Sequence, residues 1–286
     1  MLFESLIDLD KPVLKFKKEG DILYIISEKK ILKVDVNTGD IIQSKDVFLK
    51  NSKTRDLLID KEIIYARDFY KLHKIDKEKL EIIETWELGS DLSSDICALG
   101  QDENNVYVAI RNGDFAVINK FTGEVKKYPL SDSSMWDMII SDYIYAGNVE
   151  GNLIVIDRMD FKVIYQKKIH RKNFKSLLLI GDEIFTASQD FSMSRINRNT
   201  YEIIGTRKNC HKKMFYLVGY WKNYIITMSP PCGEMKFWDM LDLSLYKTIY
   251  RASWHSFIEG DILYEKEGNS IVRSELKDLI EYDNSG

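Results

Sequence analysis

The sequence predicts an all-β fold, a seven-bladed β-propeller of four-stranded antiparallel blades. One observation is a repeat: an apolar run containing an aromatic or large aliphatic residue recurs every 38 to 42 residues along the chain. A second is the run of glycine and Asx turns between these segments. A strand-based repeat of this length is typical of propellers. The recurring column consists of Tyr24, Tyr65, Tyr107, Tyr145, Phe185, Ile226 and Tyr264.

The first repeat shows how one blade is built. Residues 13–16 predict an inner strand and residues 21–26 a buried second strand. Residues 31–36 alternate between apolar and polar side chains, and residues 40–43 predict the outer strand. β-branched and aromatic runs of this length, separated by Gly, Asn and Asp, indicate antiparallel strands joined by tight turns.

Two kinds of turn recur in the later repeats. Glycine is expected between the second and third strands, at Gly113, Gly151, Gly233 and Gly268, because tight hairpins need positive φ. An Asx residue ends the third strand, where its side chain can accept hydrogen bonds from the following turn. This Asx column consists of Asp35, Asp76, Asn119, Asp157, Asn197 and Asp239.

The two ends of the chain are predicted to share the last blade. Its outermost strand is poorly formed at residues 276–282, whereas the N-terminal residues 2–8 are strand-like. We therefore predict that residues 2–8 supply this outer strand and close a single domain spanning residues 1–286. Six blades plus a cap is the structural alternative.

The bulk composition favours a cytoplasmic protein. The net charge is −4, and no apolar run approaches the ~18 residues of a membrane helix. The N-terminus lacks the basic region of a secretory signal. Cys97, Cys210 and Cys232 are odd in number and scattered, which fits a reducing compartment.

Several segments resemble the WD-repeat family of propellers. They are the Trp238-Asp239 dipeptide, residues 145–157 and residues 185–190. His170 and His211 each lie 15 residues before a column residue, where that family places a structural histidine. Residues 31–40 also resemble quinoprotein-type propeller repeats. Both resemblances imply the same architecture, and neither implies a shared activity.

The WD-repeat resemblance implies that His, Ser, Asp and Trp form a buried, hydrogen-bonded set within a blade. No blade carries all four: the fifth has Ile196 in place of Trp, and the sixth lacks the Asp. The residues to which the resemblance assigns structural roles are His170, Ser188, Asp190, His211, Trp238 and Asp239.

The sequence shows no set of residues that predicts catalysis. The four histidines lie far apart, without the close-spaced ligand pairs of a zinc site. There is no strand–turn–helix elbow around a serine and no glycine-rich phosphate loop. We expect no catalytic residue, cofactor or metal. An enzyme acting on a small molecule over the central channel is retained as an alternative.

Two links between blades are strongly basic and contain no acid. They join the fourth strand of one blade to the first strand of the next, about 40 residues apart, so both should emerge on one face. The links at residues 90–95 and 131–137 are acidic instead. The cations are Lys167, Lys168, Arg171, Lys172 and Lys175 in the first link, and Arg207, Lys208, Lys212 and Lys213 in the second.

These features predict a non-catalytic scaffold or adaptor subunit that docks a protein partner on this face. Phe191 and Trp254 are candidate aromatic anchors beside the basic links. One alternative is an accessory subunit that binds RNA or another polyanion through the same cations. Another is that the links are simply solvated. No membrane partner is expected.

Overall fold

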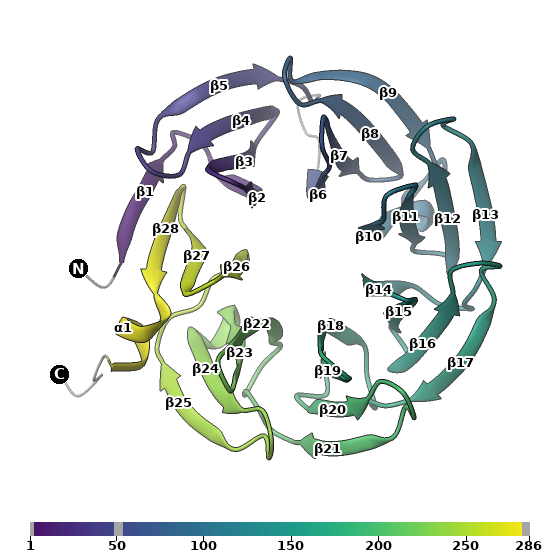
Figure 1. Cartoon of the computed structure of the whole chain (residues 1–286), viewed down its shortest axis with the longest axis vertical. Helices are drawn as coiled ribbons and strands as arrows, with labels where there is room; N and C mark the ends of the chain where they lie inside the picture. Colours follow the sequence, from purple (N-terminus) through teal and green to yellow (C-terminus); the bar gives the residue numbers. More distant parts are fainter. Residues whose placement is uncertain (1–2, 49–53, 282–286) are drawn as a thin grey trace. The chain divides into compact units, whose positions relative to one another are not determined.

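The computed structural model describes residues 3–48 and 54–281. It contains seven four-stranded antiparallel sheets, which are the blades of a seven-bladed propeller, as predicted (Figure 1). Two compact units divide the described chain. The N-terminal unit comprises residues 4–48, 54–132 and 266–272, and the C-terminal unit comprises residues 3, 133–265 and 273–281.

Each of the first three blades runs as a meander from its inner to its outer strand. Blade 1 contains Val13–Glu19 (β2), Ile22–Ser27 (β3), Lys30–Asp35 (β4) and Ile41–Asp46 (β5). Blade 2 contains Thr54–Ile59 (β6), Ile63–Asp68 (β7), Lys71–Asp76 (β8) and Glu81–Glu87 (β9). Blade 3 contains Ile96–Gln101 (β10), Asn105–Ile110 (β11), Asp114–Asn119 (β12) and Val125–Pro129 (β13), preceded by the 3₁₀ turn Leu92–Ser94 (η1).

The next three blades belong to the C-terminal unit. Blade 4 contains Met135–Ile140 (β14), Tyr143–Asn148 (β15), Asn152–Asp157 (β16) and Val163–Lys168 (β17). Blade 5 contains Phe174–Ile180 (β18), Glu183–Ser188 (β19), Met193–Asn197 (β20) and Ile203–Arg207 (β21). Blade 6 contains Tyr216–Trp221 (β22), Tyr224–Ser229 (β23), Glu234–Asp239 (β24) and Leu245–Ile249 (β25), with the 3₁₀ turn Pro230–Cys232 (η2) in its hairpin.

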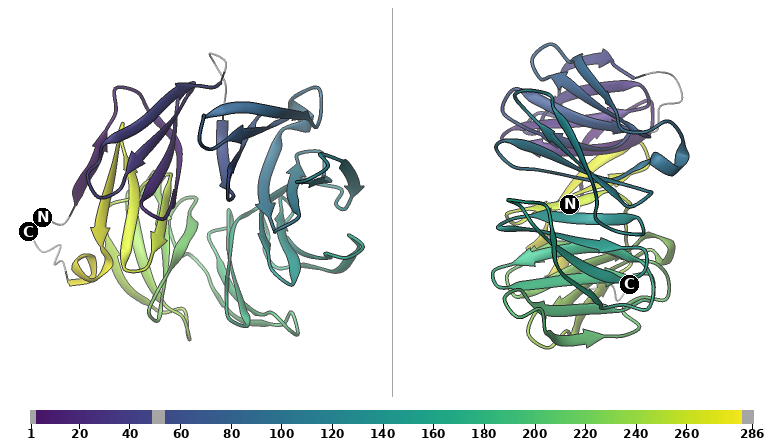
Figure 2. Two further views of the ribbon diagram at one scale, coloured as in Figure 1. Left: turned by 45° about the horizontal axis from the view of Figure 1, so that its top comes forward. Right: turned by 90° about the vertical axis from the view of Figure 1, so that its right-hand side faces the viewer.

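Blade 7 combines both ends of the chain. Its strands are Ser256–Glu259 (β26), Ile262–Glu267 (β27) and Ser270–Glu275 (β28), with Glu4–Asp8 (β1) as the outermost strand. Figure 2 shows this purple N-terminal strand beside the yellow C-terminal strands. The predicted closure by the N-terminal strand is confirmed, although Leu2 lies outside the described residues.

The sequence suggested a weak outer strand at residues 276–282. This expectation is wrong, because Leu276–Glu281 is a short helix (α1). β1 already occupies the outer position of blade 7. Leu276 and Leu279 are buried and pack in the apolar cluster of blade 6, with Trp221 and Ile249. Tyr282 lies outside the described residues. Among the described helices, none has the length and apolar character needed to span a membrane.

The Asx column forms the turns that the sequence predicts. The Oδ1 atom of Asn197 accepts hydrogen bonds from the backbone N–H groups of Asn199 and Thr200, at 2.8 and 2.9 Å. Four residues after each Asx, a residue with positive φ donates its N–H to the Asx carbonyl, as Tyr201 does at 2.8 Å. Its ring packs on Tyr165 of the preceding outer strand, with centroids 4.3 Å apart. The turn therefore joins two consecutive blades.

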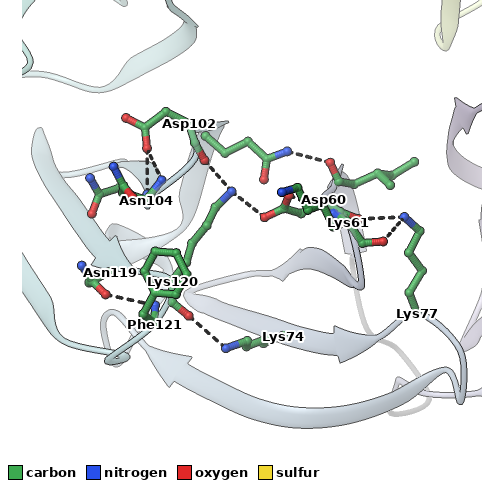
Figure 3. A network of polar contacts seen from close by, with 12 residues as sticks. Asp60, Lys61, Lys74, Lys77, Asp102, Asn104, Asn119, Lys120 and Phe121 are labelled. Carbon is green, nitrogen blue, oxygen red and sulfur yellow. Dashed lines mark hydrogen bonds and ion pairs between the residues drawn. The ribbon is translucent and has the colours of Figure 1, made fainter.

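A cation directly after the Asx residue makes a second connection between blades. Lys120 Nζ contacts Asp60 Oδ2 at 2.6 Å and the Asp102 carbonyl at 2.5 Å (Figure 3). Asp102 lies in the β10–β11 turn of the same blade, and Asp60 lies in the β6–β7 turn of the preceding blade. The ammonium also lies 5.8 Å from the ring centroid of the column residue Tyr65. We call this arrangement the inter-blade clasp.

The same clasp recurs between blades 1 and 2 and, in the C-terminal unit, between blades 4 and 5. Lys77 Nζ contacts the carbonyls of Asp60 and Lys61, both at 2.7 Å (Figure 3). It also forms an ion pair with Glu19 of blade 1. Arg198 pairs with Asp142 of blade 4, and its Nε lies 3.0 Å from the Tyr145 hydroxyl.

The clasp becomes apolar where the column residue carries no hydroxyl. Phe185 packs in one cluster with Met240, which follows the Asx residue of the next blade. Ile226 packs in a cluster with Leu276, which occupies the equivalent position of blade 7. At these two positions an apolar column residue is therefore covered by an apolar residue in place of a cation.

We predict that Lys120→Met lowers the free energy of unfolding by about 1–3 kcal/mol, because Asp60 and the Asp102 carbonyl lose their shared charged donor. Lys126→Met is the control, since this exposed lysine pairs with the exposed Glu124, and the substitution should cost under about 0.5 kcal/mol. Urea titrations measure both. Equal losses in the two variants would contradict the clasp.

Candidate partner-binding surface

Three links of the C-terminal unit lie at one end of its blades. They connect an outer strand to the next inner strand and comprise residues 169–173, 208–215 and 250–255. We call these three segments together the link surface. The first two contain or adjoin the basic runs found in the sequence.

The β19–β20 hairpin of blade 5 holds the first two links together. The backbone N–H of Arg171 donates to Asp190 Oδ2 at 2.8 Å, and that of Gln189 donates to the Asn173 carbonyl at 2.9 Å. On the other side, the N–H of Cys210 donates to the Phe191 carbonyl at 2.9 Å. Both basic links therefore lie at the same end of blade 5, as their spacing predicts.

The third link is joined to the second through Tyr216. Tyr216 directly follows residues 208–215, and its hydroxyl donates to the Ser253 carbonyl and lies 3.4 Å from Ser256 Oγ. Burial raises the pKa of this tyrosine far above its ordinary value, so the hydroxyl keeps its proton and remains a donor. The three links form one connected surface.

His170 is buried beneath the first link, but its partners differ from those implied by the family resemblance. Its ring nitrogens lie 2.7 Å from Ser192 Oγ and 2.7 Å from Thr186 Oγ1. Asp190 accepts the Ser192 hydroxyl and N–H, and lies 3.7 Å from the ring. Ser188 instead donates to the Lys172 carbonyl, so it holds the link rather than the histidine.

His211 has a more complete set of partners than the sequence indicates. Its ring nitrogens lie 2.9 Å from Thr227 Oγ1 and 3.2 Å from Glu234 Oε2. Trp238 donates its indole N–H to the same threonine hydroxyl at 2.8 Å. Glu234 therefore takes the place of the missing aspartate.

Asp239 has no part in the histidine set of blade 6 and caps the following turn, accepting the N–H of Leu241 at 2.8 Å. Sequence reasoning missed Thr186, Ser192, Thr227 and Glu234. The two threonines directly follow the column residues Phe185 and Ile226, a regularity that was available in the sequence.

The two buried histidines and the buried Cys210 thiol are electrically neutral at pH 7. Burial lowers the pKa of His170 to about 4 and that of His211 to about 4, and it raises the pKa of the Cys210 thiol to about 12. Within the described residues, no three His, Cys, Asp or Glu side chains are placed to hold a metal ion.

The charge of the link surface comes from side chains that point into solvent. Eight of the nine predicted cations are exposed, and across the described chain none of the eight has a carboxylate within ion-pair distance. They are Lys167, Lys168, Arg171, Lys172, Arg207, Lys208, Lys212 and Lys213.

Lys175 differs from the other eight cations. It is half-buried, its ammonium lies 4.9 Å from the ring centroid of Trp136, and burial lowers its pKa.

The predicted aromatic anchors have different environments. Trp254 is 53% exposed in the third link. Phe191 is half-buried at positive φ in the β19–β20 hairpin, where its carbonyl accepts the N–H of Cys210 in the second link. Tyr250, which sequence reasoning missed, is 74% exposed in the third link.

The acidic link at residues 90–95 belongs to the N-terminal unit, where Asp91 caps its own turn by accepting the Ser93 N–H.

Comparison with known proteins identifies the fold. No protein-family model matches the sequence. No curated protein matches it either. Among solved structures, the RRP9 WD40 repeats match at 11% identity with a TM-score of 0.80, covering 96% of this chain and 97% of that one.

Two fungal structures give the same result. The Cps50 (Swd1) β-propeller domain of Myceliophteria thermophila matches at 12% identity with a TM-score of 0.78, covering 96% and 99% of the two chains. The Pan2 WD40 domain of Neurospora crassa matches at 13% identity with a TM-score of 0.75, covering 96% and 95%. The chain therefore has a WD-repeat-like propeller fold, as the sequence resemblance implied.

We predict that acid weakens the protein through these histidines. In the unfolded chain His170 and His211 bind protons below pH about 6.5, whereas in the folded protein they bind them only near pH 4. Stability is therefore fully present above pH about 6.5 and is lost as the pH falls towards 4. At pH 5 the loss should be on the order of 2 kcal/mol per histidine.

Urea titrations at pH 7 and pH 5 measure this difference. His170→Asn and His211→Asn should each reduce the pH-dependent loss by on the order of 2 kcal/mol at pH 5, whatever their stability at pH 7. An unchanged pH dependence in both variants would contradict the assignment.

Proposed function

We propose that this chain is a non-catalytic interaction module, acting in the cytoplasm, that docks an acidic protein partner on the link surface. The observation that carries the proposal is a set of eight exposed cations on or directly before two adjacent links, none of which has a described carboxylate within ion-pair distance of its side chain. Charged groups left unpaired in this way attract a partner of opposite charge and steer its approach.

The rigidity of the links supports docking of a protein. The backbone N–H groups of Arg171 and Cys210 are hydrogen-bonded to the β19–β20 hairpin. His170 and His211 are buried and hydrogen-bonded below them. A surface that is already ordered loses little conformational entropy on binding, so more of the contact energy appears as affinity.

RNA is the second candidate partner, because the same unpaired cations would also bind phosphates. Phosphate contacts release counterions, so this binding would weaken steeply as salt rises. The two candidates predict different outcomes in one experiment.

That experiment is affinity purification from a lysate of the source cells, with and without ribonuclease. We expect the native chain to retain a stoichiometric protein partner in both samples. Lys172→Glu with Lys212→Glu should lose it, because the cations become repulsive to an acidic surface. The control is Lys61→Glu with Lys222→Glu, which changes the net charge equally at two exposed turns outside the link surface.

Retention of the same partner by the Lys172→Glu, Lys212→Glu variant would contradict the proposal. Loss of the partner on ribonuclease treatment alone would favour the RNA candidate instead.

A further inference from the structure

The third link differs chemically from the two basic links. Its exposed large side chains are the aromatic residues Tyr250 and Trp254, at 74% and 53% exposure. Its one Lys or Arg, Arg251, is directed into the fold: Nε lies 3.0 Å from Glu265 Oε2, and the guanidinium carbon lies 3.7 Å from the ring centroid of Phe3. The link surface therefore divides into a cationic part and an aromatic part.

The backbone beneath Trp254 is fixed. Ser253 is buried, its hydroxyl donates to the His255 carbonyl at 3.1 Å, and it accepts the His255 N–H at 3.3 Å. The Tyr216 hydroxyl donates to the Ser253 carbonyl from below. Trp254 thus stands on an ordered turn, and an exposed tryptophan on an ordered backbone is the usual centre of a protein interface.

The separation of the two parts distinguishes a peptide from single-stranded RNA. In proteins that bind single strands, a cationic groove follows the phosphates alongside the aromatics on which successive bases stack, because each nucleotide carries both a base and a phosphate. Here the cations lie on the first two links and the exposed aromatic side chains on the third. A peptide that matches this arrangement has a run of negative charges beside one apolar side chain.

We propose that the link surface recognises an acidic peptide segment that carries one aromatic or long aliphatic side chain beside its acidic run. The carboxylates lie on Arg171, Lys172, Lys212 and Lys213, and the apolar side chain packs on Trp254. This inference rests on the proposed function and specifies the chemistry of its partner.

Two fluorescein-labelled peptides test the inference by fluorescence anisotropy. Both contain a run of alternating Glu and Asp followed by a short Ser-Gly tail, and one has a Phe within that tail. The native chain should bind the Phe peptide about tenfold more tightly, a typical contribution of one interface anchor. Trp254→Ala should remove this difference while leaving the affinity for the all-acidic peptide unchanged.

Phe121→Ala is the matched control, because Phe121 is 77% exposed on a turn of the N-terminal unit. It should leave both affinities unchanged. Lys172→Glu with Lys212→Glu should weaken both peptides at least tenfold, and rising salt should weaken both in the native chain.

The outcomes separate this inference from the proposed function. If both peptides bind equally and only the lysine variant matters, the aromatic anchor is wrong while acidic docking stands. If neither peptide responds to the lysine variant, both proposals fail. Tighter binding of a labelled oligouridine than of either peptide would overturn the peptide in favour of RNA. If sedimentation velocity shows a dimer that Trp254→Ala abolishes, the occupant of the link surface is a second copy of this chain.

Discussion

Lys120 and Arg198 each bind acceptors on two consecutive blades, and this connection aligns those blades with one another. Apolar packing between sheets is non-directional, so it does not by itself set how one blade is aligned with the next. A buried ammonium that must satisfy an acid on one blade and a carbonyl on the other does set it. The positive-φ residue at the end of the same turn adds an apolar contact, as Tyr201 does on Tyr165. Together these contacts fix how each of these blades is aligned with the preceding one.

The link surface lies at the opposite ends of these strands and depends on a second set of polar contacts. His170 and His211 are neutral and buried, and each reaches a threonine on the second strand of the blade that follows its link. The hairpin between the second and third strands then holds the link backbone. These internal contacts are made by buried side chains, by the carboxylates of Asp190 and Glu234 and by backbone atoms, rather than by the side chains of the exposed lysines.

Much of the fold could be predicted from the sequence because the repeat is encoded in local chemistry. The column from Tyr24 to Tyr264 marks the second strand, and the Asx residues mark the turns that they cap. The helix at Leu276–Glu281 was not predicted, because a segment of six residues is too short to be helical by itself and this one is held by the burial of Leu276 and Leu279 among residues of blade 6. Glu234 was missed as a histidine partner because pairing with His211 requires knowing that two strands place it there. The exposure of Tyr250 and the inward direction of Arg251 also depend on tertiary contacts.

The central claim is that the cation after the third strand couples one blade to the next, and a double-mutant cycle on Asp142 and Arg198 tests it most directly. Asp142→Asn, Arg198→Met and the double variant would be compared by urea unfolding at pH 7. The account predicts a coupling free energy of about 0.5–1 kcal/mol, because the two side chains form one ion pair across blades 4 and 5 in which Asp142 is half-exposed. Strictly additive losses would contradict it.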